Sequence, residues 1–113
     1  MTDRHSAVHE DDVERQEHSD RWSKDLVGTE GTPTTAGFSL GVAEYHAQEF
    51  GPLQTHDDQE ALYVVSGEGQ VRVGDALYCV RPGIALYVPP NTVHATRRTG
   101  ERPVKVVYAH GAV

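Results

Sequence analysis

The chain has 113 residues, a formal net charge of −7 and a single cysteine, Cys79. The acidic balance disfavours nucleic acid and anionic membrane surfaces as partners. A lone cysteine cannot close an internal disulfide, which favours a reducing cytoplasm. No apolar run approaches the roughly 20 residues that cross a bilayer, so the sequence predicts a cytoplasmic protein that engages neither nucleic acid nor membrane.

Residues 1–27 are interpreted as a polar arm, because they are rich in charged and poor in apolar side chains. Such a segment buries too little surface to offset the entropy lost on ordering, which favours a mobile arm. The alternative is that residues 13–26 pack on the rest of the chain, with Trp22 and Leu26 as a helical anchor pair four residues apart. Residues 28–35, rich in glycine and threonine, form a linker.

Residues 36–113 are predicted to form one domain of short strands. Large and small residues alternate over 38–43, so Phe38, Leu40 and Val42 are expected to share one apolar face. Short strands with turn residues about every eight positions indicate an all-β sandwich or barrel. The further strands are expected at residues 61–66, 70–73, 77–80, 84–88, 93–99 and 104–109.

Residues 54–67 place metal-binding side chains at strand spacing. Gln54 and His56 point the same way, about 6.6 Å apart, because side chains alternate along a strand that rises ~3.3 Å per residue. The two aspartates that follow favour a turn, since their side chains bond to nearby backbone N–H groups. This turn would set Glu60 across from His56. A second stretch, in which a strand ends in a proline-rich turn before His94, is the natural partner.

Together the two stretches resemble the paired motifs of the cupin superfamily. The positions that match the two motifs are His56, Glu60, Gly67, Gly83, Pro89 and His94. The resemblance covers roughly residues 36–110 and implies a cupin-type jelly-roll β-barrel, a small single-domain member with an arm-like N-terminal segment.

Four positions depart from the motifs. Gln54 stands where the first histidine belongs, and Gln48 stands where the leading glycine belongs. Asn91 replaces a glycine of the second motif, which is tolerable because asparagine is the commonest non-glycine residue at positive φ. Arg98 replaces the closing asparagine.

The ligand types favour a metal site. His56, Glu60 and His94 supply two imidazoles and one carboxylate, which is the donor set of non-haem iron(II) oxygenases. The resemblance implies one divalent first-row transition metal ion per chain: Fe, Mn, Ni, Cu or Zn. Gln54 is a fourth candidate ligand, although its amide oxygen is a weaker donor; it would bind the ion, orient a water or contact substrate. The alternative is a polar network in a metal-free barrel.

Two further side chains are candidates for catalysis. Strand alternation places Arg98 on the same side as His94, where its guanidinium would bind a carboxylate, phosphate or enolate. The alternative for Arg98 is a salt bridge at the rim. His46, at the open end of the first strand, is a candidate general base, or simply an exposed strand-end residue.

The remaining reactive side chains are interpreted structurally. Tyr63 faces outward by strand parity from Glu60, His110 is given no role, and Cys79 is expected to be a small core residue. The other tyrosines are interpreted as packing residues at sheet faces or at a dimer contact: Tyr45, Tyr78, Tyr87 and Tyr108.

Three functions fit the sequence. The favoured one is a metal-dependent enzyme acting on a small organic substrate, above all an oxygenase, with isomerases and cyclases as neighbours; small cupins of this kind often serve natural-product or catabolic pathways. The alternatives are a non-catalytic ligand-binding or sensing cupin and a storage or structural protein, the last of which needs neither Glu60 nor His94. A homodimer is expected, because a small barrel gains stability from association and Tyr63 and Val65 lie on an outer sheet face. The alternative is a monomer whose N-terminal arm covers that face.

Overall fold

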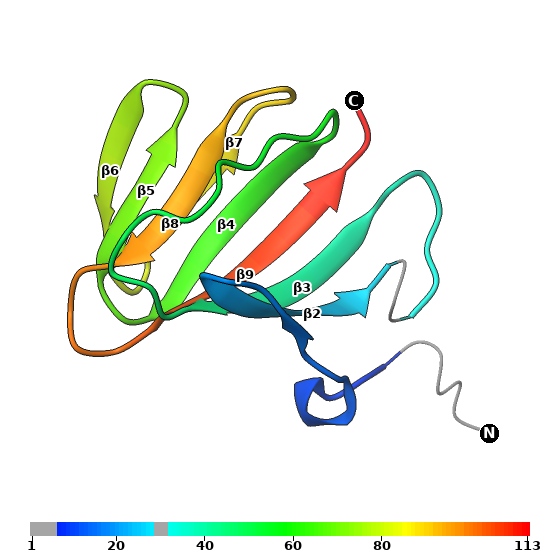
Figure 1. Cartoon of the computed structure of the whole chain (residues 1–113). Coiled ribbons are helices and arrows are strands. Elements are labelled where there is room, and N and C mark those ends of the chain that lie inside the picture. Colours follow the sequence, from blue (N-terminus) through cyan, green and yellow to red (C-terminus); the bar gives the residue numbers. More distant parts are fainter. Residues whose placement is uncertain (1–6, 29–31) are drawn as a thin grey trace.

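The computed structural model describes residues 7–28 and 32–113, which form two antiparallel sheets with the core between them (Figure 1). The larger sheet has the strand order β1 (Gln16–Glu17), β2 (Arg21–Val27), β3 (Ser39–Tyr45), β9 (Val104–Gly111), β4 (Gln59–Ser66) and β7 (Ala85–Val88). The smaller sheet has the order β6 (Ala76–Val80), β5 (Gly69–Val73) and β8 (His94–Arg98). The described residues contain one short 3₁₀ turn, η1 (Glu10–Asp12), and no helix long and apolar enough to span a membrane.

The predicted all-β architecture is confirmed. Each strand expected between residues 61 and 109 has a counterpart whose ends differ from the prediction by at most two residues. The β5–β6 hairpin turns at Gly74, which has a φ of 59°. Glycine adopts this left-handed conformation without steric cost, so turn chemistry read from the sequence located the hairpin correctly.

The N-terminal segment adopts the folded alternative over residues 21–27. These residues form β2, which pairs with β3 from Arg21↔Tyr45 onward. Trp22 is buried, with the cations of Arg15 and Lys24 at 4.6 and 5.5 Å from its ring. The expected helical anchor pair was wrong, because the segment is extended and gains backbone hydrogen bonds from an existing sheet edge. Residues 1–6 of the predicted arm and 29–31 of the predicted linker lie outside the described residues.

The turn η1 is fixed to the outer face of the larger sheet by Glu10. Its carboxylate accepts a hydrogen bond from Lys105 Nζ at 2.8 Å, and its backbone oxygen accepts one from Lys24 Nζ at 2.6 Å. The hydrogen bond from Lys105 holds the pKa of Glu10 below 4.5. Residues 7–15 therefore contact this face at β2 and β9, while Tyr63 on β4 and Tyr87 on β7 are exposed.

The inner face of β3 differs from the prediction. The core cluster takes Ala43 and Tyr45 from this strand, whereas Phe38 and Leu40 are exposed. Gly41 has no room for a side chain, because a Cβ there would overlap the ring of Tyr108. Val42 is buried, although strand alternation puts it on the face opposite Ala43. The remaining members of the core cluster are Leu62, Val64, Val71, Val80, Val104 and Val106.

Strand parity along β4 is confirmed, and the prediction for Cys79 is wrong. Leu62 and Val64 are buried, while Tyr63 is 51% exposed. Cys79 is exposed. It lies on β6, an edge strand whose first four residues are all exposed, so an apolar pattern there did not indicate burial.

Candidate metal centre

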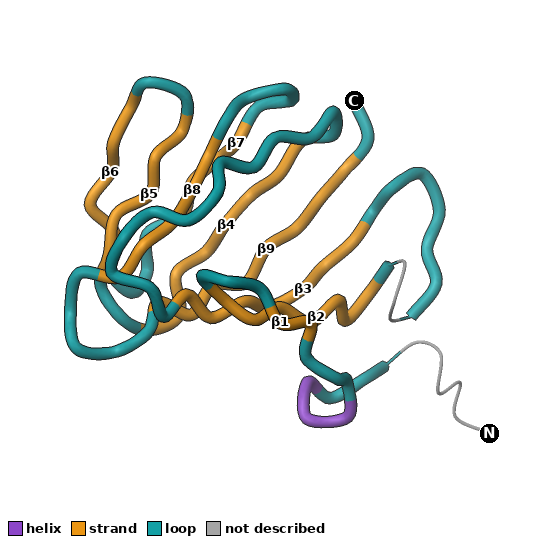
Figure 2. The backbone as a smooth tube through the Cα atoms, in the orientation of Figure 1, coloured by secondary structure: helices purple, strands orange, loops and turns teal. Residues whose placement is uncertain are grey.

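The loop from residue 46 to 58 connects β3 to β4 and carries the first histidine of the site across to the smaller sheet (Figure 2). Gln54 and His94 exchange two backbone hydrogen bonds of 2.9 Å. The backbone N–H of Asn91 donates to the carbonyl oxygen of His56 at 2.7 Å. Asn91 has a φ of 56°, as its place in the motif predicts. These contacts fix His56 against the turn that precedes His94.

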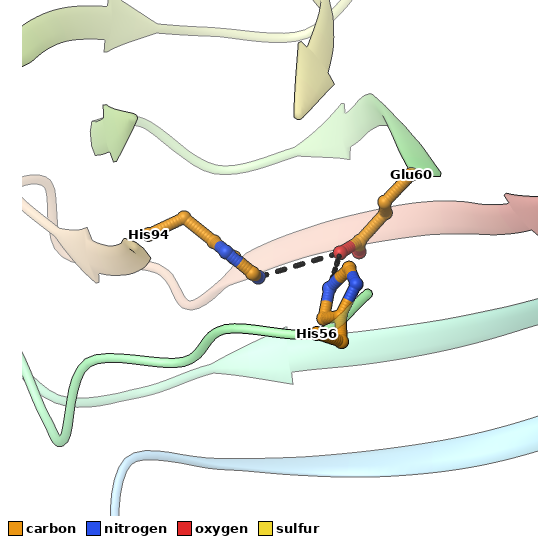
Figure 3. Close-up of side chains that lie close together, drawn as sticks. All are labelled: His56, Glu60 and His94. Carbon is orange, nitrogen blue, oxygen red and sulfur yellow. Dashed lines mark hydrogen bonds and ion pairs between the residues drawn. The ribbon is translucent and has the colours of Figure 1, made fainter. Parts of the chain in front are cut away.

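Three of the predicted ligands lie together, because the rings of His56 and His94 both approach the same carboxylate oxygen, Oε1 of Glu60 (Figure 3). Nε2 of His56 lies 2.9 Å from this oxygen, and Nε2 of His94 lies 3.4 Å from it. Glu60 is 8% exposed and His94 5% exposed. The expected turn after His56 therefore does set Glu60 across from it.

The three residues fit a divalent metal ion. His56, Glu60 and His94 each offer a ligand atom within 4.8 Å of the others, and imidazole with carboxylate suits first-row divalent ions. Metal binding requires neutral imidazoles and a carboxylate, so it would displace the protons now shared between the histidines and Glu60.

Glu60 and His94 have oppositely shifted pKa values. Burial alone would raise the pKa of Glu60, but the hydrogen bond with His94 and the charges of His110 and His94 outweigh it and hold the pKa below 4.5. Burial alone would lower the pKa of His94, but the hydrogen bonds to Glu60 and to the Thr92 carbonyl raise it above 6.5. The metal-free protein therefore favours the ionised pair.

This pair predicts how the stability of the metal-free protein depends on pH. The contribution of Glu60 is present above about pH 4.5 and is lost as pH falls through its lowered pKa. The contribution of His94 is complete below about pH 6.5 and is lost as pH rises through its raised pKa. Thermal unfolding of chelator-treated protein should therefore show a midpoint that falls as the pH is raised from about 6 to about 9.

The variant Glu60→Gln is the control for this pH dependence. Without the carboxylate the largest contribution that raises the pKa of His94 is removed, so the midpoint should vary less over the same range. Equal slopes for the two proteins would contradict the assignment.

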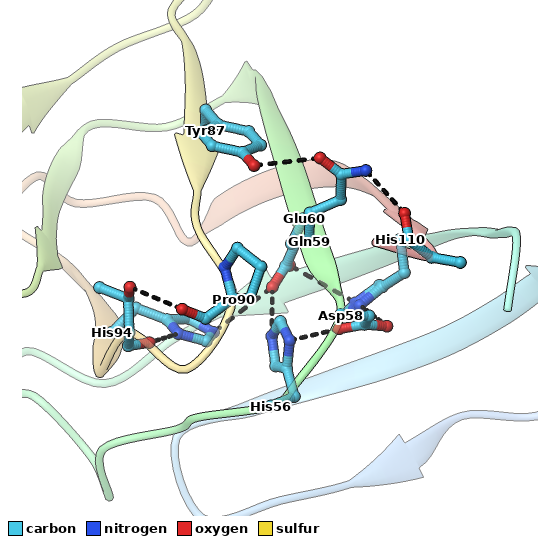
Figure 4. Close-up of polar contacts among 10 residues, drawn as sticks. His56, Asp58, Gln59, Glu60, Tyr87, Pro90, His94 and His110 are labelled. Carbon is cyan, nitrogen blue, oxygen red and sulfur yellow. Dashed lines mark hydrogen bonds and ion pairs between the residues drawn. The ribbon is translucent and has the colours of Figure 1, made fainter.

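Two further residues, Asp58 and His110, lie against the triad (Figure 4). The sequence analysis gave them no role in the site. Together with His56, Glu60 and His94 they form a cluster of five side chains. His110 Nδ1 lies 3.0 Å from Asp58 Oδ2, and His110 Nε2 lies 3.7 Å from Glu60 Oε2. Asp58 Oδ1 lies 2.5 Å from Nδ1 of His56. A signal for His110 was available in strand alternation, because Val104, six residues earlier and therefore on the same face of the strand, is a core residue.

Gln54 lies beside the cluster but directs its amide oxygen elsewhere. Its Oε1 accepts a hydrogen bond from Arg21 Nη2 at 3.4 Å, and its Nε2 is buried without a partner among the described residues. Arg21 also pairs with Asp20 at 2.9 Å, and its guanidinium lies 5.7 Å from the ring of Tyr45. The structure thus places Arg21 inside the barrel. The sequence analysis had assigned this residue to the N-terminal arm.

The two candidate catalytic residues lie at a different place from the metal-binding triad. Arg98 Nε donates to the carbonyl oxygen of His46 at 2.8 Å, and its Nη1 donates to that of Gly100 at 2.6 Å. The guanidinium thus fixes the start of the β3–β4 loop to the end of β8. The side chain of His46 is exposed. No contact between either side chain and Glu60 is observed among the described residues, and their catalytic roles stay predictions.

A groove of about 540 Å³ opens beside the cluster. Asp58 and His110 belong both to the cluster and to the groove wall. Phe38, which is 60% exposed, gives the groove an apolar surface. The rest of the wall is formed by Gly28, Pro33, Thr34, Gly37 and Ser39.

Comparison with known proteins agrees with the observed fold and motifs. The family model for the cupin domain matches residues 41–110, which include β3, both motif stretches and most of β9. Among solved structures, the cupin domain of Schizosaccharomyces pombe Cnp3 superimposes with a TM-score of 0.78 at 17% identity, over 95% of this chain and 74% of that one. An S161A mutant of Bacillus subtilis oxalate decarboxylase OxdC gives a TM-score of 0.79 at 14% identity, over 93% and 29%. At these identities the likeness shows the fold alone.

Two curated proteins are similar in sequence. Mannose-1-phosphate guanylyltransferase RfbM of Salmonella typhimurium is 32% identical over 60 residues, 53% of this chain and 12% of that protein. Protein SchB of Streptomyces halstedii is 32% identical over 84 residues, 71% of this chain and 61% of that protein. The chain therefore spans less than two thirds of the length of either relative.

Proposed function

The chain belongs to the cupin family, and from this we propose that it is a metal-dependent enzyme, an oxygenase, that acts on a small organic substrate. The observation that carries the proposal is the convergence of His56, Glu60 and His94 beside an open groove. Two imidazoles and one carboxylate leave positions on a metal ion open, as in non-haem iron(II) oxygenases.

In this proposal each part of the site has a separate task. His56, Glu60 and His94 hold one divalent first-row ion, which when bound supplies Lewis-acid chemistry and, for a redox-active metal, oxygen chemistry. The groove binds the substrate, with Phe38 against its apolar part. Asp58 and His110 form the part of the groove wall that adjoins the three metal-binding residues.

Anaerobic purification, reconstitution with Fe(II) and an oxygen-uptake screen over small organic acids, phenols and sugars would test the enzyme. Substrate-dependent oxygen uptake that Glu60→Gln abolishes is the expected result. Binding of a compound without oxygen uptake or other turnover, under every divalent metal tried, would instead favour the alternative of a ligand-binding or sensing cupin.

We also propose that the protein is a homodimer that pairs through the outer face of β4 and β7. Tyr63 on β4 and Tyr87 on β7 are exposed there. Tyr87 is the cross-strand partner of Ala61, which lies two residues before Tyr63 on the same face of β4. The described part of the N-terminal segment, from residue 7 on, contacts β2 and β9 instead, through the hydrogen bonds of Glu10 with Lys24 and Lys105. Exposed apolar patches of this kind commonly mark interaction surfaces.

Light scattering at micromolar concentration tests the dimer. The 12.4 kDa chain should have twice its monomer mass, and Tyr63→Lys should reduce the mass to that of one chain. The matched control is Tyr78→Lys, because Tyr78 is also exposed, at 45%, but lies on β6 of the other sheet. A monomeric wild-type protein would contradict the proposal.

A further inference from the structure

We propose that His110 is a fourth metal ligand, which supplies the imidazole that Gln54 does not, and that Asp58 positions it. The inference rests on the proposed metal site and concerns its ligands. It would give the ion three imidazoles and one carboxylate, with one donor from each of the strands β4, β8 and β9 and one from the β3–β4 loop.

The position of His110 follows from the register of the larger sheet. His110 on β9 is the direct cross-strand partner of Glu60 on β4. Side chains at such positions lie on the same face with Cβ atoms about 4.5–5.5 Å apart. The ring of His110 reaches within 4.8 Å of the ring of His56, measured between centroids. Its Nε2 lies 3.7 Å from Glu60 Oε2, so His110 approaches the carboxylate from the side that the other two histidines leave free.

In each histidine ring of the cluster, Nδ1 lies next to an oxygen atom that can only accept a hydrogen bond. Asp58 contacts two rings, through Oδ1 to His56 Nδ1 at 2.5 Å and through Oδ2 to His110 Nδ1 at 3.0 Å. The carbonyl oxygen of Thr92 lies 3.0 Å from His94 Nδ1. The oxygens beside His94 and His110 lie at hydrogen-bond distance from Nδ1 and favour a proton there, whereas the approach of Asp58 to His56 is an ion-pair contact without hydrogen-bond geometry. Each ring turns its Nε2 toward Glu60. Metal-binding histidines in proteins are oriented in the same way by a carboxylate or carbonyl on the other nitrogen.

Gln54 is poorly placed to act as the fourth donor. The one metal-binding atom of its side chain, Oε1, already accepts from the guanidinium of Arg21. An oxygen held by one cation is a weaker ligand for another. The backbone of Gln54 is also fixed by its paired hydrogen bonds with His94. His110 has no such competing cation, because its Nδ1 partner is the anion Asp58.

The number of coordinated imidazoles distinguishes the two candidate ligands. Pulsed EPR of the Cu(II)-loaded protein counts imidazoles, and competition with a chelator measures affinity for Zn(II). We expect three imidazoles for wild type and for Gln54→Ala, and two for His110→Ala with a loss of affinity of more than about tenfold. Unchanged imidazole count and affinity in His110→Ala would overturn the inference while leaving the proposed metal site intact. Absence of metal binding in wild type would overturn both.

A second variant guards against misfolding of His110→Ala. Asp58→Asn removes the carboxylate that orients His110 but leaves every proposed donor atom in place. We expect it to keep three imidazoles and to lose about 10- to 100-fold in metal affinity, the usual cost of losing a partner of a metal-binding histidine. The exposed neighbour Asp57 provides the control, since Asp57→Asn should leave both measurements unchanged. Equal affinities for the two asparagine variants would contradict the role assigned to Asp58.

Discussion

Replacing His94 with alanine should lower the affinity for divalent metal by more than about 100-fold, because loss of a ligand should cost more than the 10- to 100-fold loss typical of its supporting partners. His94 is almost fully buried, and its ring is fixed by the Thr92 carbonyl and by the backbone pairing with Gln54. Neither His56 nor His110 can take its place, since they approach Glu60 from other elements. Chelator competition and elemental analysis measure the effect.

The matched control for this variant is His46→Ala. His46 is exposed and its side chain makes no hydrogen bond to the cluster in the described part of the chain. The control should bind metal as the wild type does. If His94→Ala keeps wild-type metal content, with a cooperative thermal transition that shows an intact fold, then His94 is not a ligand.

Of the two glycines that the motifs keep, Gly67 should be the more sensitive to substitution, and Gly67→Ala should lower the free energy of unfolding by about 4 kcal/mol. Gly67 has a φ of 82°, where a side chain is strained, and a Cβ there would also overlap the carbonyl oxygen of Pro103. A backbone oxygen cannot move aside as a flexible side chain can. Urea unfolding of the metal-free protein measures the loss, which is a large part of the 5–15 kcal/mol that stabilises a typical domain.

Gly83 separates the two causes of that loss. Its φ of 96° is also in the left-handed region, but no heavy atom lies within 4 Å of a Cβ placed on it. Gly83→Ala should therefore lose only the backbone term, about 1 to 2 kcal/mol. Equal losses for the two variants would show that the overlap with Pro103 does not contribute.

Local sequence patterns were sufficient for the strands from β3 onward and for the three metal-binding residues His56, Glu60 and His94. The positions of Gly67, Gly83 and Asn91 reflect local backbone needs, and all three have positive φ in the structure. His56 and Glu60 are four residues apart, so a single turn decides whether they meet. A contact across one short turn can be predicted from the turn-forming residues of a single sequence.

The residues that were missed depend on long-range register. His110 meets Glu60 only because β9 pairs with β4 at that position, 50 residues away in sequence. Arg21 enters the barrel only because β2 adds to the edge of β3, and the high charge of the N-terminal segment concealed that strand. On β3 the alternation was visible, but it did not show which face lies inward, since Ala43 and Tyr45 join the core while Phe38 and Leu40 are exposed.

The most direct test of the metal centre is an anomalous-scattering map from crystals of the protein grown with Mn(II), Zn(II) or Cu(II). One strong peak per chain, within coordination distance of His56, Glu60 and His94, is the predicted result. Crystals soaked to saturation that show no peak there, with His56 and His94 still bonded directly to Glu60 as they are in Figure 3, would contradict the central claim and identify the cluster as a polar network without a metal.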